Sequence, residues 1–436
     1  MQINFLLYKS VLVAAIAGFL FGFDTVVISG AEKDIQSIWQ LSDAMHGVAI
    51  SIALWGTVLG ALLGGIPTEY YGRKKTLIFV GFLYFISAIG SAIALELYSF
   101  IIFRFLGGIG IGISTIVAPL YISELSPPEK RGKLTGLFQF NIVLGVLAAY
   151  ISNAFISSSW RLKLGAEAIP AIVFLVLSFY LVESPRWLII KKRKKEKALK
   201  ILAQINPQFT IDQLSKMAEN IENSVSNDEK KPFFSKALLK PILLSFFIAF
   251  FNQLSGINAI LYFAPRIFEL SGLAAHSAML QSIGIGITNL IFTLIGLQMI
   301  DKFGRKQLLY LGGIGYIVSL GCCALAFYYN HPQIVPICIF TFIASHAIGQ
   351  GAVIWVFISE IFPNRFRARG QVFGCFTHWF FAALITLLFP IVVRKYSPEI
   401  IFGFFCAMMI LQVFWIKLFV PETKGISLED MPARLN

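Results

Sequence analysis

Charged side chains are scarce in this chain of 436 residues. Asp, Glu, Lys and Arg together make up 14% of the sequence, whereas soluble proteins carry roughly a quarter. Hydrophobic residues make up 57%, and the mean hydropathy is +0.76. A soluble chain of this length would need two or three domains and far more charge. The shortage of charge therefore excludes a soluble protein and indicates a polytopic membrane protein.

Cysteine is also scarce, and its placement excludes several chemistries. All five cysteines lie inside apolar segments without the spacing of metal ligands, so we expect neither a metal site nor a disulfide framework. No pair of nucleophile and base is recognisable, so an enzyme is not indicated and no cofactor is expected. The first apolar segment lacks a small-residue cleavage site, and we interpret it as a membrane span, not as a removable signal peptide.

Acidic residues are outnumbered by basic ones. There are 36 Lys and Arg against 23 Asp and Glu, which gives a formal net charge of +13. The basic residues cluster in short gaps between apolar segments, a pattern typical of cytoplasmic loops and not of a nucleic-acid-binding surface. These gaps are residues 70–75, 128–133, 191–197, 301–306 and 364–370. Each follows an even-numbered span, which predicts a multi-pass protein of the cell (cytoplasmic) membrane with both termini in the cytoplasm.

Twelve apolar segments are each about long enough to cross a bilayer roughly 30 Å thick as helices. Their approximate centres are Phe19, Thr57, Ile86, Ile111, Gly145, Leu175, Phe251, Leu290, Ser319, Ile348, Ala382 and Met409. We therefore predict an all-α membrane protein with two six-helix halves, residues 1–185 and 239–436. Residues 186–238 form a polar insert, where an amphipathic pattern broken at Pro207 predicts short cytoplasmic helices. The glycines of residues 107–112 lie inside a span and predict close helix packing, not a nucleotide-binding loop.

The two halves repeat the same charged motifs. Gly72-Arg73-Lys74 recurs as Gly304-Arg305-Lys306, roughly 235 residues later, and other charged positions recur at nearly the same offset. A constant offset indicates two copies of one six-helix unit in parallel orientation. One hypothesis is that salt bridges among these charges hold the halves together when the cavity opens outward. The positions concerned are Glu69, Arg73, Glu124, Arg131, Glu183, Arg186, Asp301, Arg305, Glu360, Arg367 and Glu422.

The seventh apolar segment carries polar residues at membrane depth. Gln253, Asn258 and Tyr262 lie within residues 251–265, where Gly256 and a proline weaken the helix. A break at Gly256 would turn all three side chains toward one cavity. Neutral amides suit an uncharged ligand rich in hydroxyls, such as a sugar or polyol. The alternative is that the amides tie this helix to its neighbours.

Six motifs along essentially the whole chain resemble those of the sugar porters of the major facilitator superfamily. They are GlyArgLysLys (72–75), ArgPheLeuGlyGlyIleGlyIleGly (104–112), SerGluLeuSerProProGluLysArgGly (123–132), GluSerProArgTrpLeu (183–188), GlnLeuSerGlyIleAsn (253–258) and ProGluThrLysGly (421–425). The resemblance implies the major facilitator fold, with a monosaccharide held mainly by the second half and by one amide of the fifth span. The substrate-binding residues that it implies are Phe21, Gln139, Asn252, Gln253, Asn258, Tyr262, Asn289, Gly351, Trp355, His378 and Trp379. Asn252 and His378, together with Ala382, differ from the family's commonest residues, so the identity of the sugar stays open.

Three ionisable residues form a candidate coupling site. Asp24 lies within the first span, Arg104 opens the fourth, and Glu167 begins the sixth. A carboxylate at membrane depth needs a proton or a partner. The resemblance implies that the Asp and the Arg pair in proton symporters, some of which also carry the Glu. If the distance within that pair changes between outward and inward states, proton affinity changes with it and couples protons to the cycle. The alternative is a permanent structural ion pair.

Together these observations predict a proton-coupled symporter of hexoses or pentoses that works by alternating access. We expect its partners to be a monosaccharide, protons and the lipid bilayer, and we expect a functional monomer that binds no nucleic acid. One alternative is a facilitative uniporter that uses the same sugar site without protons. A second alternative is a sugar sensor that binds its ligand without transporting it.

Overall fold

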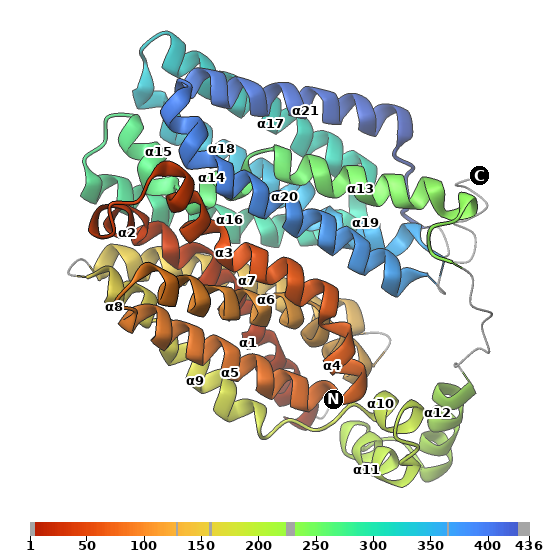
Figure 1. Ribbon diagram of the computed structural model, residues 1–436. Coiled ribbons are helices and arrows are strands. Elements are labelled where there is room, and N and C mark those ends of the chain that lie inside the picture. The colour runs from red at the N-terminus through yellow and green to blue at the C-terminus, as the bar shows by residue number, and fades with distance from the viewer. Residues whose placement is uncertain (1–4, 128–129, 157–158, 224–231, 364–365, 426–436) are drawn as a thin grey trace.

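The computed structural model describes residues 5–127, 130–156, 159–223, 232–363 and 366–425. Two helical bundles lie side by side, one built from α1–α9 and the other from α13–α21 (Figure 1). Three short helices, α10–α12, lie at one end of the first bundle, the end at which α1 begins and α21 ends. The basic loops lie at this end, which we call the basic end, and the other end is the opposite end.

The first half contains nine helices and a short 3-10 turn in the described residues. They are α1 (Phe5–Val27), η1 (Ile28–Gly30), α2 (Glu32–Ile38), α3 (Asp43–Leu63), α4 (Gly65–Tyr70), α5 (Arg73–Ile93), α6 (Leu97–Leu125), α7 (Arg131–Phe155), α8 (Trp160–Gly165) and α9 (Ala168–Ser178). The linker contains α10 (Pro185–Ile190), α11 (Lys195–Ile205) and α12 (Ile211–Asn223). The second half follows with η3 (Lys236–Leu238), α13 (Leu239–Leu254), α14 (Ile257–Tyr262), α15 (Ala264–Leu270), α16 (Ala275–Phe303), α17 (Arg305–Tyr328), η4 (Pro332–Ile334), α18 (Val335–Ile348), α19 (Gln350–Ile361), α20 (Arg367–Lys395) and α21 (Pro398–Phe419).

Eleven helical stretches among the described residues are long and apolar enough to span a membrane. They contain eleven of the twelve predicted centres. The sixth predicted span is interrupted, because α8 ends at Gly165 and α9 starts at Ala168, with Glu167 between them. The two pieces continue one another as the sixth apolar segment of the first half, so the twelve-segment prediction holds with one span divided.

Glycines let the long helices approach closely, as residues 107–112 predicted. A Cβ built on Gly108 would lie 1.9 Å from the carbonyl oxygen of Ala53, and one on Gly112 would lie 2.4 Å from that of Thr57. The backbones of α3 and α6 are therefore in contact along this seam, which larger side chains would separate.

The described residues of the linker form short helices, as the amphipathic pattern predicted. Helix α11 ends before Pro207 and α12 begins after it. A proline inside a helix removes a backbone hydrogen bond and clashes with the preceding turn. Their apolar faces are buried in a cluster with the first half, including Ala198, Ile201, Leu202 and Leu214. The linker is therefore packed against the first half at the basic end, while residues 224–231 lie outside the described part.

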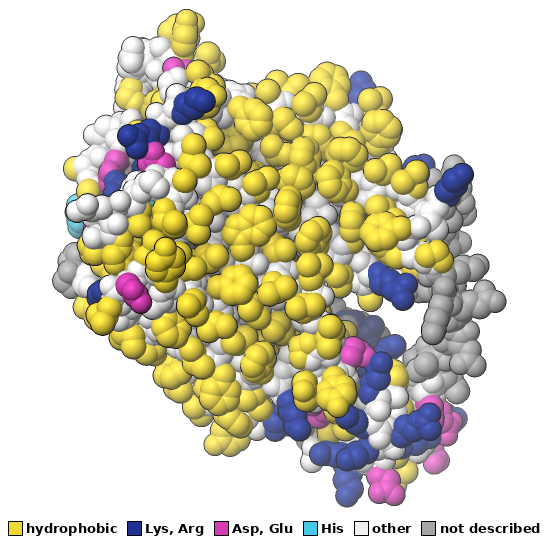
Figure 2. Space-filling model, in the orientation of Figure 1, with side chains coloured by type: hydrophobic (Ala, Val, Ile, Leu, Met, Phe, Trp, Pro, Cys, Tyr) yellow, Lys and Arg dark blue, Asp and Glu magenta, His cyan; other side chains and the backbone are white. Residues whose placement is uncertain are grey.

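The two halves meet toward the opposite end. A Cβ on Gly47 of α3 would lie 2.0 Å from the carbonyl oxygen of Leu387 on α20, so these helices touch through their backbones. Lys33 forms an ion pair with Glu269 of the other half, and Arg394 contacts Asp43 at 2.7 Å. At the basic end, Figure 2 shows a hollow between the halves with Lys and Arg side chains on both rims. The conformation is therefore closed at the opposite end and open at the basic end.

Candidate functional site

The predicted break in the seventh apolar segment is confirmed. Helix α13 ends at Leu254, and Gly256 has φ +84° and ψ +10°, a left-handed conformation that suits glycine. A second break follows at Phe263, one residue before Ala264-Pro265 starts α15. The segment is therefore three short helices in series, and the turn at Gly256 changes the direction in which the following side chains point.

The break brings the amides of this segment together. The side-chain amide of Asn258 donates a hydrogen bond to Oε1 of Gln253 at 2.7 Å, and the side-chain amide of Gln253 donates to Oδ1 of Asn252 at 2.9 Å. The Gln253 amide nitrogen also lies 3.1 Å from Nε2 of His378 on α20. Asn252 reaches Gln350 at 3.4 Å. We call residues 252, 253, 258, 350 and 378 the amide cluster. All of them are more than nine-tenths buried.

Aromatic rings surround the amide cluster. The Trp355 and His378 ring centroids are 4.9 Å apart, and Trp379 packs edge-on against Phe21 of α1 at 5.3 Å. The indole Nε1 of Trp379 is buried and has no hydrogen-bond partner among the described residues. A buried donor without a partner is costly, and a ligand hydroxyl would satisfy it.

The other predicted substrate residues lie on neighbouring helices. Tyr262 on α14 is 1% exposed. The hydroxyl of Tyr150 on α7 donates a hydrogen bond to the backbone carbonyl of Leu261, which ties α14 to the first half. Asn289 on α16 is 7% exposed and its carbonyl oxygen lies 3.4 Å from the Thr293 hydroxyl. Gln139 is partly exposed on α7 of the first half. Gly351 lies in the first turn of α19, close to the amide cluster.

The predicted coupling residues form one buried group. Arg104 on α6 donates a hydrogen bond from Nη1 to the Asp24 carboxylate and one from Nη2 to the Asp24 carbonyl oxygen at 3.3 Å. Asp24 is 1% exposed, Arg104 is 2% exposed and Glu167 is 1% exposed. Glu167 lies within electrostatic range of both. Two carboxyl groups therefore share the charge of one arginine.

Each of the two carboxyl groups has one oxygen without a protein partner in the described part of the chain. Oδ2 of Asp24 and Oε1 of Glu167 are buried and have no hydrogen-bond partner among the described residues. A second negative charge without a counterion of its own is expensive in a buried site. Tyr262 of the second half lies within electrostatic range of Asp24 and Arg104.

The repeated charges at the basic end form two matching clusters. Arg73 contacts Glu124 at 2.8 Å, and Arg305 contacts Glu360 at 2.8 Å. Glu183 and Glu422 accept the backbone N–H groups that begin α5 and α17, next to the positive-φ residues Gly72 and Gly304. Each cluster lies inside one half, so in this conformation these pairs do not join the halves.

Three carboxyl groups of these clusters have shifted pKa values. Burial, the largest effect, raises the pKa of Glu183 despite three backbone N–H donors. Burial alone would also raise the pKa of Glu422. Backbone N–H donors of Lys424, Arg305 and two other residues outweigh that effect, so the pKa of Glu422 is lowered. The pKa of Glu69 is lowered because contacts with Lys191 and Arg73 outweigh burial.

The remaining repeated charges are less informative. Arg131 is exposed at the start of α7, and Glu124 accepts a hydrogen bond from Arg73. Arg186 lies in α10, and Arg367 begins α20. The side chain of Asp301 lies outside the described part.

Sequence reasoning missed two polar contributions to the second half. Gln350 belongs to the amide cluster, and His346 forms a 2.6 Å hydrogen bond with the hydroxyl of Tyr316. A signal was available, because both residues are polar and lie within an apolar span near paired glycines. Their roles depend on the break between α18 and α19, which the pattern did not identify.

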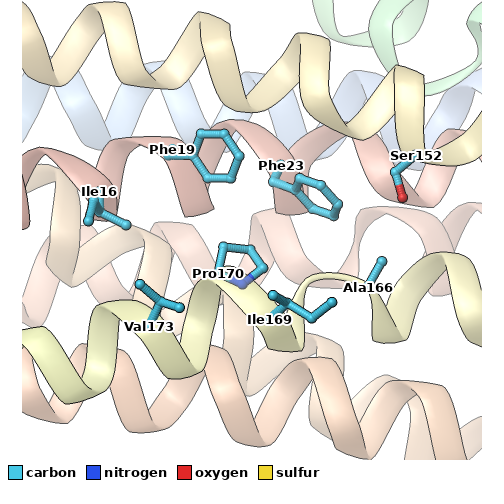
Figure 3. Close-up of a pocket in the computed structure, with 8 residues that line it drawn as sticks. All are labelled: Ile16, Phe19, Phe23, Ser152, Ala166, Ile169, Pro170 and Val173. Carbon is cyan, nitrogen blue, oxygen red and sulfur yellow. The ribbon is translucent and has the colours of Figure 1, made fainter.

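A largely apolar groove lies in the first half. It has a volume of about 420 Å³ and is formed by side chains of α1, α7 and α9, with Phe19, Phe23 and Pro170 among them (Figure 3). Ile169 and Val173 are exposed, so the groove opens on the outer surface of the first half. Its apolar walls do not suit a ligand rich in hydroxyls.

Two six-helix halves, joined at one end, with a neutral polar cluster and a buried carboxylate–arginine group, define a membrane transporter of the major facilitator type. Residues 10–435 match the family described as sugar (and other) transporters. The chain belongs to this family.

Individual relatives agree with this assignment. The chain is 32% identical to the D-xylose-proton symporter of Escherichia coli K12, over 98% of this chain and 95% of that protein. It is 33% identical to the arabinose-proton symporter of Bacillus subtilis, over 96% of this chain and 92% of that protein. The inward-open structure of the xylose transporter XylE from E. coli is similar with a TM-score of 0.87 and 31% identity, covering 99% of this chain and all of that one.

Proposed function

We propose that this protein is a proton-coupled monosaccharide symporter that works by alternating access. The observation that carries the proposal is the buried group of Asp24, Arg104 and Glu167, which has two carboxyl groups for one arginine. The relatives named as proton symporters of xylose and arabinose support the same reaction. A single structural ion pair would need only one carboxylate.

The amide cluster is the proposed sugar site. Its neutral donors and acceptors match the hydroxyls of a hexose or pentose, and the rings of Trp355 and Trp379 suit the apolar face of a pyranose. Tyr262 links the two sites, because it lies on the broken helix of the sugar site and within electrostatic range of Asp24. Movement of α14 during the cycle would therefore change the surroundings of the proton site.

The open basic end corresponds to the cytoplasmic side in this proposal. The excess of Lys and Arg in the loops at that end supports a cytoplasmic location for both termini and for α10–α12. The protein would then reside in the cell membrane as a functional monomer, with its apolar outer surface in contact with lipid. The conformation described is the inward-open state of the cycle.

Uptake into proteoliposomes tests the proposal. Labelled xylose and glucose are offered under an inward proton gradient and a membrane potential of about 100 mV, which is worth roughly 2.3 kcal/mol per charge or about 50-fold accumulation. We expect accumulation that a protonophore abolishes. Asp24→Asn and Glu167→Gln should lose accumulation but keep exchange of internal for external sugar, while Glu219→Gln, an exposed linker carboxylate, should behave as wild type.

Other outcomes point to the alternatives. Wild-type uptake that stops at equilibrium and ignores the protonophore would make the protein a uniporter and Asp24–Arg104 a structural pair. Sugar binding without uptake or exchange would favour a sensor. If neither sugar binds, the amide cluster is not a sugar site.

A further inference from the structure

A second imidazole lies close to the amide cluster. His346 is in the last turn of α18, three residues before Gly349, where α18 ends and α19 begins. It lies within the spanning stretch Pro332–Ile361, yet its side chain is partly exposed. A partly exposed polar ring at this depth faces either lipid or an internal cavity, and its neighbours decide between the two.

The inner edge of the His346 ring is fixed. Nδ1 lies 2.6 Å from the hydroxyl of Tyr316 on α17, which is fully buried. The Ser255 side chain interacts with the same hydroxyl, and Ser255 Oγ also donates to the backbone carbonyl oxygen of Asn252 at 2.6 Å. The hydroxyls of Tyr316 and Ser255 therefore connect His346 to the turn that breaks the seventh span.

The opposite edge of the ring lies beside α19. A Cβ built on Gly351 would lie 3.3 Å from Nε2 of His346, so this glycine leaves the imidazole edge uncovered. One helical turn after Gly351, Trp355 packs on His378 of the amide cluster, and His378 is within electrostatic range of His346. The two imidazoles therefore lie beside the same face of α19, the face that meets the amide cluster.

We propose that His346 contacts the substrate and helps to determine which sugar is accepted, an inference that rests on the proposed function. Tyr316 holds Nδ1, and Nε2 forms a hydrogen bond with one sugar hydroxyl above Gly351. Either tautomer serves, because a hydroxyl both donates and accepts. Since Tyr316 fixes the ring, the bond has a set direction and selects for a hydroxyl in one position. Tyr316 is a positioning residue in this scheme.

Binding of a panel of sugars tests the role of His346. Quenching of tryptophan fluorescence gives dissociation constants for xylose, glucose and the 2-, 3- and 6-deoxyglucoses with the full-length purified protein. His346→Phe should weaken binding of the parent sugar by about 3- to 10-fold, the value of one hydrogen bond. The analogue that lacks the contacted hydroxyl should bind wild type and His346→Phe equally well.

Two further variants separate contact from packing. Tyr316→Phe should give a smaller loss with the same pattern across the analogues, and His346→Gln should recover part of the affinity for the parent sugar. His276→Phe, the same change at an exposed position of α16, should leave every constant unchanged. If His346→Phe does not fold, the pattern in Tyr316→Phe decides.

Three results would overturn the role of His346. They are unchanged binding in His346→Phe, an equal loss for all sugars in the panel, and a Tyr316→Phe pattern unrelated to any one hydroxyl. Each of these leaves the proposed function intact, provided that the wild type binds and transports sugar. Wild-type protein that binds no sugar in the panel would instead refute the proposed function.

Discussion

The ion pairs at the opposite end predict which substitution opens that end. Glu32 on α2 is 1% exposed, and its carboxylate accepts hydrogen bonds from Nε and Nη2 of Arg266 on α15 at 3.0 and 2.9 Å. Nε2 of His46 lies 3.0 Å from the same carboxylate. Because α2 and α15 belong to different halves, this contact breaks when the halves separate there. Arg266→Gln removes it in the closed state.

The size of the effect follows from burial. Removing one partner of a buried ion pair costs about 3–5 kcal/mol, because the other charge stays buried without a counterion. Arg266 is 21% exposed, and water entering at that side lowers the cost to about 2 kcal/mol. In the open state Glu32 is hydrated and the cost disappears. Since 1.4 kcal/mol is tenfold, the ratio of closed to open at this end should fall by about 30-fold.

Pulsed electron resonance between two spin labels measures that ratio. Ile38→Cys on α2 and Leu270→Cys on α15 are exposed attachment sites on the two sides of the contact, in a background with the native cysteines replaced by serine. Arg266→Gln should increase the population with a long distance between the labels. Glu32→Gln in the same chain should restore the short distance, because the buried charge is then absent.

A matched control uses a second pair between the halves. Arg394 contacts Asp43 at 2.7 Å but is 76% exposed, and exposed pairs are worth about 0–1 kcal/mol. Arg394→Gln should therefore shift the ratio by about fivefold at most. An Arg394→Gln shift that equals or exceeds that of Arg266→Gln, or an unchanged distribution in Arg266→Gln, would show that burial of Glu32 does not hold this end closed.

Two further predictions concern the broken helix and the basic end. Gly256→Ala should lower the melting temperature and weaken sugar binding at least tenfold, because an L residue at φ +84° costs about 1–2 kcal/mol and its methyl would lie 2.7 Å from the Phe405 ring. Gly403→Ala, whose methyl meets no atom within 4 Å, is the control and should not reduce either quantity. Glu422 and Glu183 should respond to pH in opposite directions in thermal unfolding. The lowered pKa of Glu422 means that its contribution is present above its ordinary value of 4.5 and is lost as pH falls through the folded value, so the deficit of Glu422→Gln should shrink toward pH 4. The raised pKa of Glu183 makes its contribution to stability grow as pH falls, so wild type should gain stability over Glu183→Gln as pH falls from 7. Parallel curves of melting temperature against pH for the two variants would contradict the assignment.

Local sequence properties determined the architecture of this protein. Hydropathy over about twenty residues sets the spans, because a helix in lipid must bury apolar side chains and satisfy its own backbone. The repeat of Gly72-Arg73 at Gly304-Arg305 predicted two equivalent halves, and matching clusters are present in both. Gly256 predicted the break that brings Gln253 and Asn258 together. This could be predicted locally because glycine, which lacks a Cβ, tolerates a positive φ in any surroundings.

The tertiary structure decided which residues meet across helices. The repeat singled out the charged positions, but packing of α5 against α6 decides that Glu124 pairs with Arg73. The contact of His346 with Tyr316 and Gly351 depends on how α17, α18 and α19 are rotated about their axes, which no local pattern specifies. The closed end depends on pairs such as Glu32 with Arg266, far apart in the chain. The choice between open and closed ends rests on a few kcal/mol summed over such contacts, so only the assembled halves decide it.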